Sequence, residues 1–339
     1  MKFRQLKPPE AQHTIKVPLE LEGMDSTNKF YWTIDMDETD DKLQLALGLF
    51  YDLGQGGISD PQEAVYWYKR SANQGNREAQ TALALCYQEG TGVEVNFEKA
   101  VYWYELAALQ DFSIAQCNLG YCYEVGQGVA KDIEQAIYWT KKAAFQGLAK
   151  AQNNLANYYK IGLGLEQSFT KAIYWFRKAA NQDDPIAQGQ LGYLYEQGLG
   201  VTKNEKKAFC WYEKSASLGN TLSLCCLGQC YHFGIGTEIN FEKALECYRV
   251  AATCGDDIAQ YCLGMCYDYG DIIEEDIALA FFWYKKSAEQ GYDFAQFDIG
   301  RFYQHGICVE KDIQTAISWY KKAAAQGNQL AVKALEELE

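Results

Sequence analysis

The sequence has few of the residues and segments on which catalysis, secretion and membrane insertion depend. Only three of its 339 residues are histidines, and no spacing joins His13, His232 or His305 to a serine or cysteine nucleophile and an acid. No apolar run approaches the ~18 residues that span a bilayer. The first twenty residues lack the apolar segment of a secretory signal. We therefore expect no enzyme activity, no membrane insertion and a cytoplasmic location, with the nucleus as the other candidate.

Basic charge is also in short supply. The 31 lysines and arginines face 45 aspartates and glutamates, which gives a formal net charge of −14. A nucleic-acid-binding protein would normally present a basic face, so we expect no nucleic-acid partner and a neutral or basic protein partner instead. Cysteine is plentiful, with 12 residues. Without a secretory signal, free thiols are expected, and no cofactor is implied.

The chain does contain a repeat, which fills most of its length. A GxG turn recurs at a constant step of 36 residues without any insertion. Each copy carries a leucine or isoleucine seven residues before the first glycine, a tyrosine three residues before it, and alanines after it. Seven of the eight copies also carry a tryptophan. The turns begin at Gly54, Gly90, Gly126, Gly162, Gly198, Gly234, Gly270 and Gly306.

Each copy reads as two helices. In the third copy Ala115, Leu119 and Tyr123 share one helical face, and Ala136 and Trp139 share another. A residue able to accept from the first free N–H groups stands before every second helix. These residues are Asp60, Asn96, Asp132, Ser168, Asn204, Asn240, Asp276 and Asp312. In the first copy, Pro61 and Glu63 after Asp60 also suit a first helical position and a capping box.

A single helix pair cannot bury enough apolar surface, but stacked pairs can. The predicted fold is therefore all-α, a right-handed α/α superhelix (solenoid) of eight 36-residue helix-turn-helix repeats plus a C-terminal capping helix. We expect an irregular N-terminal arm over residues 1–40, the repeats over 41–328 and the capping helix over 329–339.

The GxG turn has two interpretations. A glycine-rich loop before a helix can hold a phosphate, but phosphate-binding loops follow a strand, whereas a helix precedes each turn here. We therefore interpret the turn as a helix C-terminus with its first glycine at positive φ. Ile272 and Cys308 replace the second glycine in the last two copies. Either these two loops differ in backbone, or φ at this position is negative in every copy.

The repeat resembles the Sel-one-like repeat (SLR) family, and copy three shows its motif as AQCNLGYCYEVGQGVAKDIEQAIYWTKKAAFQG. The resemblance implies a superhelix similar to tetratricopeptide repeats, whose first helices line a concave surface. It also implies a non-enzymatic adaptor or scaffold that binds a protein or peptide. Some cysteine-rich relatives bind penicillin, so a penicillin-binding or β-lactamase-like enzyme is the alternative, as is an activator subunit of an enzyme complex. This chain lacks their regular cysteine pair in each repeat.

A thiol metal site is a further alternative. Cys226 and Cys230 share one helical face, and Cys262 and Cys266 repeat that spacing one unit later. Four thiols on neighbouring helices could hold zinc. The other interpretation is that these cysteines are small buried core residues.

The resemblance to tetratricopeptide repeats also indicates which positions would line the concave groove. They lie two and five or six residues after the repeated leucine, and two before it. Aromatic residues, methionine and arginine at such positions are typical of binding surfaces. The expected partner-binding residues are Tyr121, Tyr193, Gln229, Phe233, Tyr261, Met265, Tyr269, Phe297 and Arg301.

Overall fold

The computed structural model describes residues 40–54, 57, 59–270 and 273–338, and its secondary structure there is entirely helical. The predicted N-terminal arm lies outside these residues except for Asp40, and so does Ile272. The chain forms two compact units, the first ending at Gln146 and the second beginning at Gly147. The helices of the first unit are α1 (Asp41–Asp52), α2 (Pro61–Asn73), α3 (Arg77–Glu89), α4 (Phe97–Leu109), α5 (Ser113–Val125) and α6 (Ile133–Phe145).

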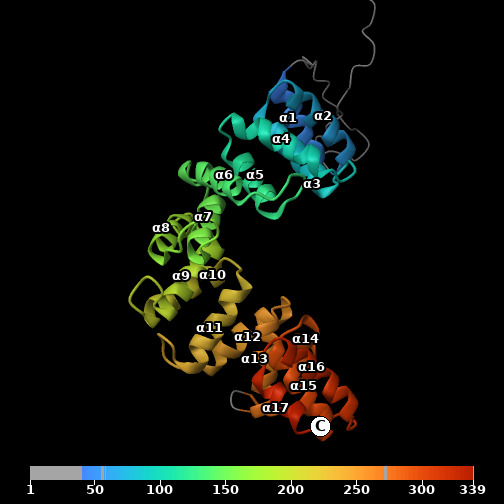
Figure 1. Ribbon diagram of the computed structural model, residues 1–339, viewed down its shortest axis with the longest axis vertical. Coiled ribbons are helices and arrows are strands. Elements are labelled where there is room, and N and C mark those ends of the chain that lie inside the picture. The colour runs from blue at the N-terminus through green and yellow to red at the C-terminus, as the bar shows by residue number, and fades with distance from the viewer. Residues whose placement is uncertain (1–39, 55–56, 58, 271–272, 339) are drawn as a thin grey trace, which may run out of the picture. The chain divides into compact units, whose positions relative to one another are not determined.

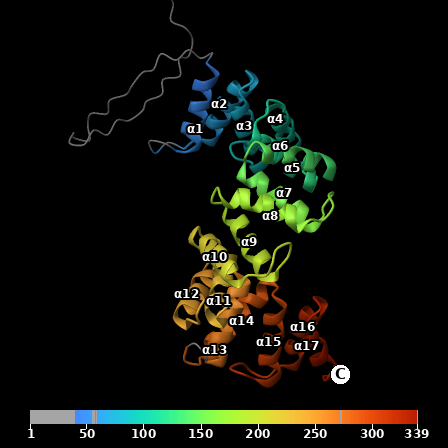
Figure 2. The same ribbon diagram turned by 90° about the vertical axis from the view of Figure 1, so that its left-hand side faces the viewer.

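Within each unit the helices pack in chain order. Every even-numbered helix packs on the odd-numbered helix before it, and the pairs stack on one another, as both views show (Figure 1 and Figure 2). The predicted all-α solenoid with a C-terminal helix is thereby confirmed. The second unit contains α7 (Ala149–Ile161), α8 (Phe169–Ala180), α9 (Pro185–Gln197), α10 (Glu205–Ser217), α11 (Thr221–Phe233), α12 (Phe241–Thr253), α13 (Asp257–Tyr269), α14 (Ile277–Gln290), α15 (Asp293–His305), α16 (Ile313–Ala325) and α17 (Gln329–Glu336).

The second helix of every repeat begins at the predicted capping residue. Asp132, for example, accepts a hydrogen bond through Oδ1 from the backbone N–H of Gln135 at 3.0 Å. Its own N–H donates to the carbonyl of Tyr123 at 2.9 Å, and the equivalent bond closes the loop in all eight repeats. The cap therefore both starts the second helix and fixes the end of the first helix beside it.

The capping box expected in the first repeat is only half formed. Pro61 is the first residue of α2, and Asp60 Oδ1 accepts from the Glu63 N–H at 3.1 Å, as predicted. The Asp60 N–H, however, donates to the Tyr51 carbonyl at 3.2 Å instead of to the Glu63 side chain. The loop-closing bond common to all repeats takes the place of the reciprocal bond of the box.

The glycines of the turn have separate tasks. The first ends the helix in the left-handed conformation, as at Gly126 with φ 77°, which confirms the predicted turn. The second allows close approach of the preceding repeat, because a Cβ on Gly128 would lie 2.2 Å from the carbonyl oxygen of Phe97. Neither alternative given above for Cys308 is correct, because φ at this position is positive in the other described copies and also at Cys308. Cys308 keeps the left-handed conformation with φ 47°, and its Sγ lies 3.8 Å from the Ile277 carbonyl oxygen.

The core combines large and small side chains from both helices of each repeat. Tyr104, Tyr248 and Tyr284 are completely or almost completely buried. A glycine or alanine follows the repeated leucine in every copy, where it faces the second-helix side chain. A Cβ on Gly264 would lie only 2.6 Å from the ring of Tyr284. The two helices of a repeat thus pack more closely than larger residues would permit.

Buried glutamines join neighbouring repeats, a feature that we call the glutamine ladder. A first-helix glutamine donates to an alanine carbonyl and accepts from a glutamine at the end of the second helix 30 residues later. Gln260, for example, donates to the Ala252 carbonyl at 3.2 Å and accepts from Gln290 at 2.9 Å. The complete pairs are Gln44–Gln74, Gln80–Gln110, Gln116–Gln146, Gln152–Gln182, Gln260–Gln290 and Gln296–Gln326.

The ladder is interrupted in the second unit. Leu218 and Cys254 stand where the other six repeats have the donor glutamine, and Leu224 replaces the first-helix glutamine of the sixth repeat. Gln188 still donates to the Ala180 carbonyl at 3.1 Å. Its Oε1 is buried, and none of the described residues donates to it. The interruption therefore leaves one buried acceptor unsatisfied.

Candidate functional site

The first helices of both units carry exposed apolar side chains along one face, which we call the first-helix stripe. In the first unit it includes Leu49, Leu85, Ile114, Tyr121 and Val125. In the second unit it includes Ile161, Ile186, Tyr193, Leu222, Phe233, Tyr269, Phe294 and Leu330. Helical spacing brings these residues to one face, because they lie seven and four residues apart within a helix. Exposed apolar stripes of this kind are candidate binding surfaces.

Four of the predicted binding residues belong to this stripe. Tyr121 and Tyr193 are 46% and 45% exposed, and Phe233 and Tyr269 are 60% and 70% exposed. The ring of Phe233 stacks on His232 with the centroids 4.2 Å apart. This contact restricts the orientation of the exposed Phe233 ring.

The other predicted residues make contacts inside the chain. Arg301 lies between two carboxylates, with Nη2 2.7 Å from Asp268 Oδ2 and Nε 3.1 Å from Asp298 Oδ1. Burial raises the pKa of Asp298 above its ordinary range, although the Arg301 charge opposes that rise. The guanidinium therefore serves the α13–α15 contact, and sequence alone could not show that carboxylates face it.

The remaining four pack within the second unit. Tyr261 lies on Tyr284 and Phe297 on Tyr320, with ring centroids 5.4 and 5.6 Å apart. Met265 packs against the cores of both adjacent repeats. Gln229 Nε2 lies 3.9 Å from the Cys262 sulfur. All four are partly buried, so they present less surface to a partner than the exposed members of the stripe do.

The second helices carry another exposed stripe, which sequence analysis missed. The residue before the repeated tryptophan is an exposed aromatic at Tyr66, Tyr102, Tyr138, Tyr174 and Phe282. Its ring contacts the neighbouring tryptophan edge-on, with centroids 4.9 to 5.2 Å apart. The signal was present in the sequence, because the Tyr-Trp pair recurs at the repeat period. This stripe provides a matched set of exposed aromatics on the other helices.

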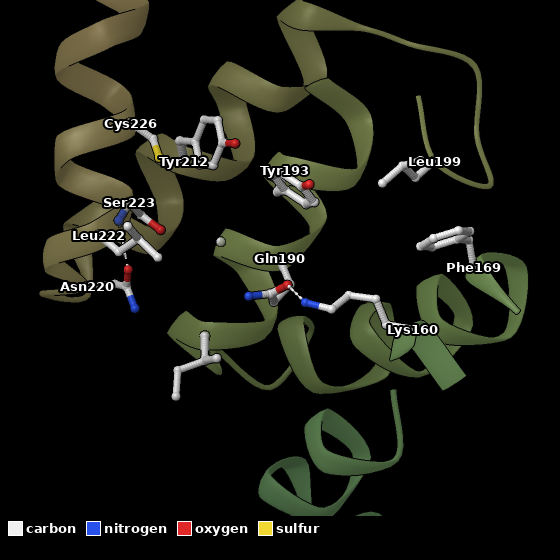
Figure 3. Close-up of a pocket in the computed structure, with 12 residues that line it drawn as sticks. Lys160, Phe169, Gln190, Tyr193, Leu199, Tyr212, Asn220, Leu222, Ser223 and Cys226 are labelled. Atoms are coloured by element: carbon white, nitrogen blue, oxygen red, sulfur yellow. Dashed lines mark hydrogen bonds between the residues drawn. The ribbon is translucent and has the colours of Figure 1, made fainter. Parts of the chain in front are cut away.

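A pocket of about 460 Å³ opens beside α9 in the second unit (Figure 3). Side chains from α7 to α11 line it, and the backbone of Gly189 forms part of its wall. The lining is largely apolar, with Phe169, Ile186, Leu199, Leu222 and the ring of Tyr212. This volume falls in the range of about 300–1,000 Å³ that is typical of ligand sites.

Lys160 supplies the positive end of this pocket. Its Nζ donates to Gln190 Oε1 at 2.8 Å, and the close-up shows the two side chains meeting (Figure 3). None of the twelve lining residues is acidic. Partial burial lowers the pKa of Lys160 from its ordinary value. The amine therefore has a hydrogen-bond partner but no carboxylate within the pocket to balance its charge.

The cysteines do not form the metal site considered above. Within the described residues, no group of three or more His, Cys, Asp or Glu side chains is placed to hold a metal ion. Cys225 rather than Cys226 meets Cys262, in a core that excludes Cys230. Cys226 instead lines the pocket, and burial raises its pKa to about 12. All twelve cysteines are free thiols, nine of them buried or half-buried, which suits small core residues.

In the described part of the chain, no helix combines the length and the apolar character needed to cross a bilayer.

A family model for the Sel1 repeat matches the chain eight times. The matched residues are 42–76, 77–112, 113–148, 149–184, 185–220, 223–256, 257–292 and 293–328. A comparison with curated proteins gave no match.

Two solved structures share this fold and a substantial part of the sequence. The first is a protective antigen of uropathogenic Escherichia coli with an SLR fold, 36% identical over 87% of this chain with a TM-score of 0.71. The present chain spans 63% of the length of that one. The second is a Sel1 repeat protein from Oxalobacter formigenes, 31% identical with a TM-score of 0.65, with 89% of this chain and 88% of the other covered. The eight repeat matches occupy most of the sequence, and the chain belongs to the Sel1 repeat family.

Proposed function

We propose that this protein is a non-enzymatic adaptor that holds a peptide or a partner helix against the first-helix stripe. The observation that carries the proposal is the stripe itself, a row of exposed apolar side chains on the first helices within each unit. Exposing such side chains is unfavourable for an isolated soluble protein, and a partner that covers them would remove that cost. The net charge of −14 favours a neutral or basic partner overall.

The stripe can be tested with matched surface variants. The first combines Tyr121→Ser, Phe233→Ser and Tyr269→Ser on the first helices. The control combines Tyr66→Ser, Tyr102→Ser and Tyr174→Ser, which removes three rings of 41 to 54% exposure from the second helices. Affinity purification from native cells with quantitative mass spectrometry would compare both with the wild type.

The proposal requires that the first variant loses specific partners while the control keeps them. Urea unfolding of both variants would show that each remains folded, since exposed side chains contribute little to stability. Retention of every partner by a folded first variant would refute binding at the first-helix stripe. If only the control loses those partners, the binding surface lies on the second helices instead.

A further inference from the structure

The pocket beside α9 lies where one repeat lacks a side chain that the others possess, and where the Ser223 hydroxyl takes up the space next to that position. Gly189 lies two residues before the repeated Leu191. The other seven repeats have a larger residue at that position: Leu45, Thr81, Cys117, Asn153, Cys225, Tyr261 and Phe297. Helical glycine costs about 0.5–1 kcal/mol relative to alanine, so its presence in the middle of α9 is not explained by helix stability.

The last two repeats show what fills the equivalent space. Tyr261 covers the second-helix ring of Tyr284, and Phe297 covers that of Tyr320 in the same way. In the fifth repeat the corresponding ring is Tyr212, and it lines the pocket. The ring of Tyr212 is held in place, because its hydroxyl donates to Glu196 Oε2 at 2.6 Å. An aromatic side chain in the pocket would therefore meet a fixed ring, as the chain's own side chains do two and three repeats later.

The charge of the pocket adds a second requirement. The ammonium group of Lys160 is the charged group in a largely apolar lining without an acidic residue. A carboxylate beside the aromatic ring would balance this charge at close range. The Glu196 carboxylate accepts from the Tyr212 hydroxyl and does not line the pocket, so Lys160 is the group that a carboxylate would approach. Charges more than about 8 Å away are largely screened at physiological ionic strength.

We propose that this pocket binds a partner segment that carries a large aromatic side chain with a carboxylate next to it. The aromatic ring occupies the pocket beside Gly189 and Ser223 and packs on Tyr212. The carboxylate pairs with Lys160. The inference rests on the adaptor function proposed above and adds the chemistry of the segment that the adaptor recognises.

The test uses N-acetyl-4-fluorophenylalanine, which has one ring and one carboxylate, and its neutral carboxamide. Binding to the full chain is followed by the width and shift of the ¹⁹F signal. Gly189→Phe with Ser223→Ala fills the pocket and reproduces the last repeat, where Phe297 is followed by Ala331 in the next first helix. Ser223→Ala is included because a Cβ on Gly189 would lie 2.5 Å from Ser223 Oγ, and Ser223→Ala alone is the matched control.

Saturable binding of the acid to the wild type and to Ser223→Ala is expected. The filled variant should bind it at least about tenfold more weakly, a difference of 1.4 kcal/mol. Lys160→Gln should weaken binding of the acid and leave that of the carboxamide unchanged. Equal binding to the filled variant, or no saturable binding to the wild type, would overturn the proposal.

A second measurement needs no variant and covers the case in which the filled variant fails to fold. With labelled isoleucine and leucine methyl groups, the probe should shift the signals of Ile186, Leu199 and Leu222, which line the pocket. Shifts confined to other residues would contradict the assignment. The outcomes also separate this proposal from the adaptor function. Partner loss in the first-helix stripe variant with no probe binding would refute the pocket alone, and probe binding with no partner loss would refute the stripe alone.

Discussion

Replacing Leu218 by glutamine should complete the Gln188 pair of the glutamine ladder and stabilise the second unit. Leu218 ends α10 with φ −93° and ψ 11°, close to the −92° and 0° of Gln326, which completes the last pair. A glutamine can therefore adopt the backbone without strain. Its Nε2 would reach Gln188 Oε1, the buried acceptor that lacks a donor among the described residues. The observed ladder bonds in this unit, of 2.9 to 3.0 Å, indicate the geometry expected.

The expected gain is about 1 kcal/mol. An unsatisfied buried acceptor costs about 1–3 kcal/mol, and the new bond would remove most of that penalty. Ordering a glutamine in place of a leucine costs about 1 kcal/mol in side-chain entropy. Little apolar burial is lost, because Leu218 is 46% exposed and the glutamine stem covers part of the same surface. For a unit of this size the gain corresponds to a rise in Tm of about 2–4 °C.

Urea unfolding measures the effect, with an unchanged m-value as the condition for comparing midpoints. The double variant Leu218→Gln with Gln188→Leu is the decisive control, because it lacks the acceptor and should gain nothing over Gln188→Leu. Gln290→Leu, which removes the donor from an intact pair, should lower stability by about 1–2 kcal/mol. Equal gains from Leu218→Gln in both backgrounds would show that the stabilisation has another source. No gain in either background would refute the penalty assigned to Gln188.

Four further predictions follow from single sites. Cys308→Gly should raise stability by about 1 kcal/mol in urea unfolding, because it relieves a left-handed cysteine. Asn240→Ala should lower stability by about 1 kcal/mol through loss of the cap, whereas Asn240→Asp should be nearly neutral. Native thiol titration should label only Cys210, Cys254 and Cys308 before unfolding, with Cys308 slowed because burial raises its pKa. Burial also raises the folded-state pKa of Asp298, so the contribution of this group to folding stability is largest at low pH and is lost as the pH rises through that pKa. The urea midpoint of the wild type should therefore rise relative to that of Asp298→Asn as the pH falls from 7 towards 4.

The periodic features of the fold could be predicted from the sequence because each appears eight times. The helix pairs, their caps and the left-handed turns depend on short-range hydrogen bonds between residues that the period brings into register. The loop-closing bond from each cap N–H to the carbonyl of the repeated tyrosine was not predicted, although the same reasoning could have predicted it. The glutamine ladder was visible as a recurring Gln80 and Gln110 pattern, but its meaning depends on the additional bond from Gln80 to the Ala72 carbonyl of the preceding repeat.

The candidate site was less predictable, because it depends on what faces each residue. Arg301 has the composition of a binding residue, yet Asp268 on the preceding first helix occupies its guanidinium. The position of Gly189 could have been noticed by aligning the eight copies. Its consequence could not, because a pocket also requires that Ser223, Leu199 and Lys160 leave the space open.

Several departures from the repeat lie around one contact, between α9, α10 and α11. Gly189 removes a side chain there, Leu218 and Leu224 interrupt the ladder, and Ser223 replaces the alanine found in all other repeats but the first. In a solenoid each repeat contacts only its neighbours, so such changes alter one interface and leave the others intact. Completing the ladder here should therefore stabilise the second unit without changing probe binding, since Gln188 and Leu218 do not line the pocket. Tighter probe binding by Leu218→Gln would instead show that the interrupted ladder and the pocket are coupled, and that local instability at this interface forms part of recognition.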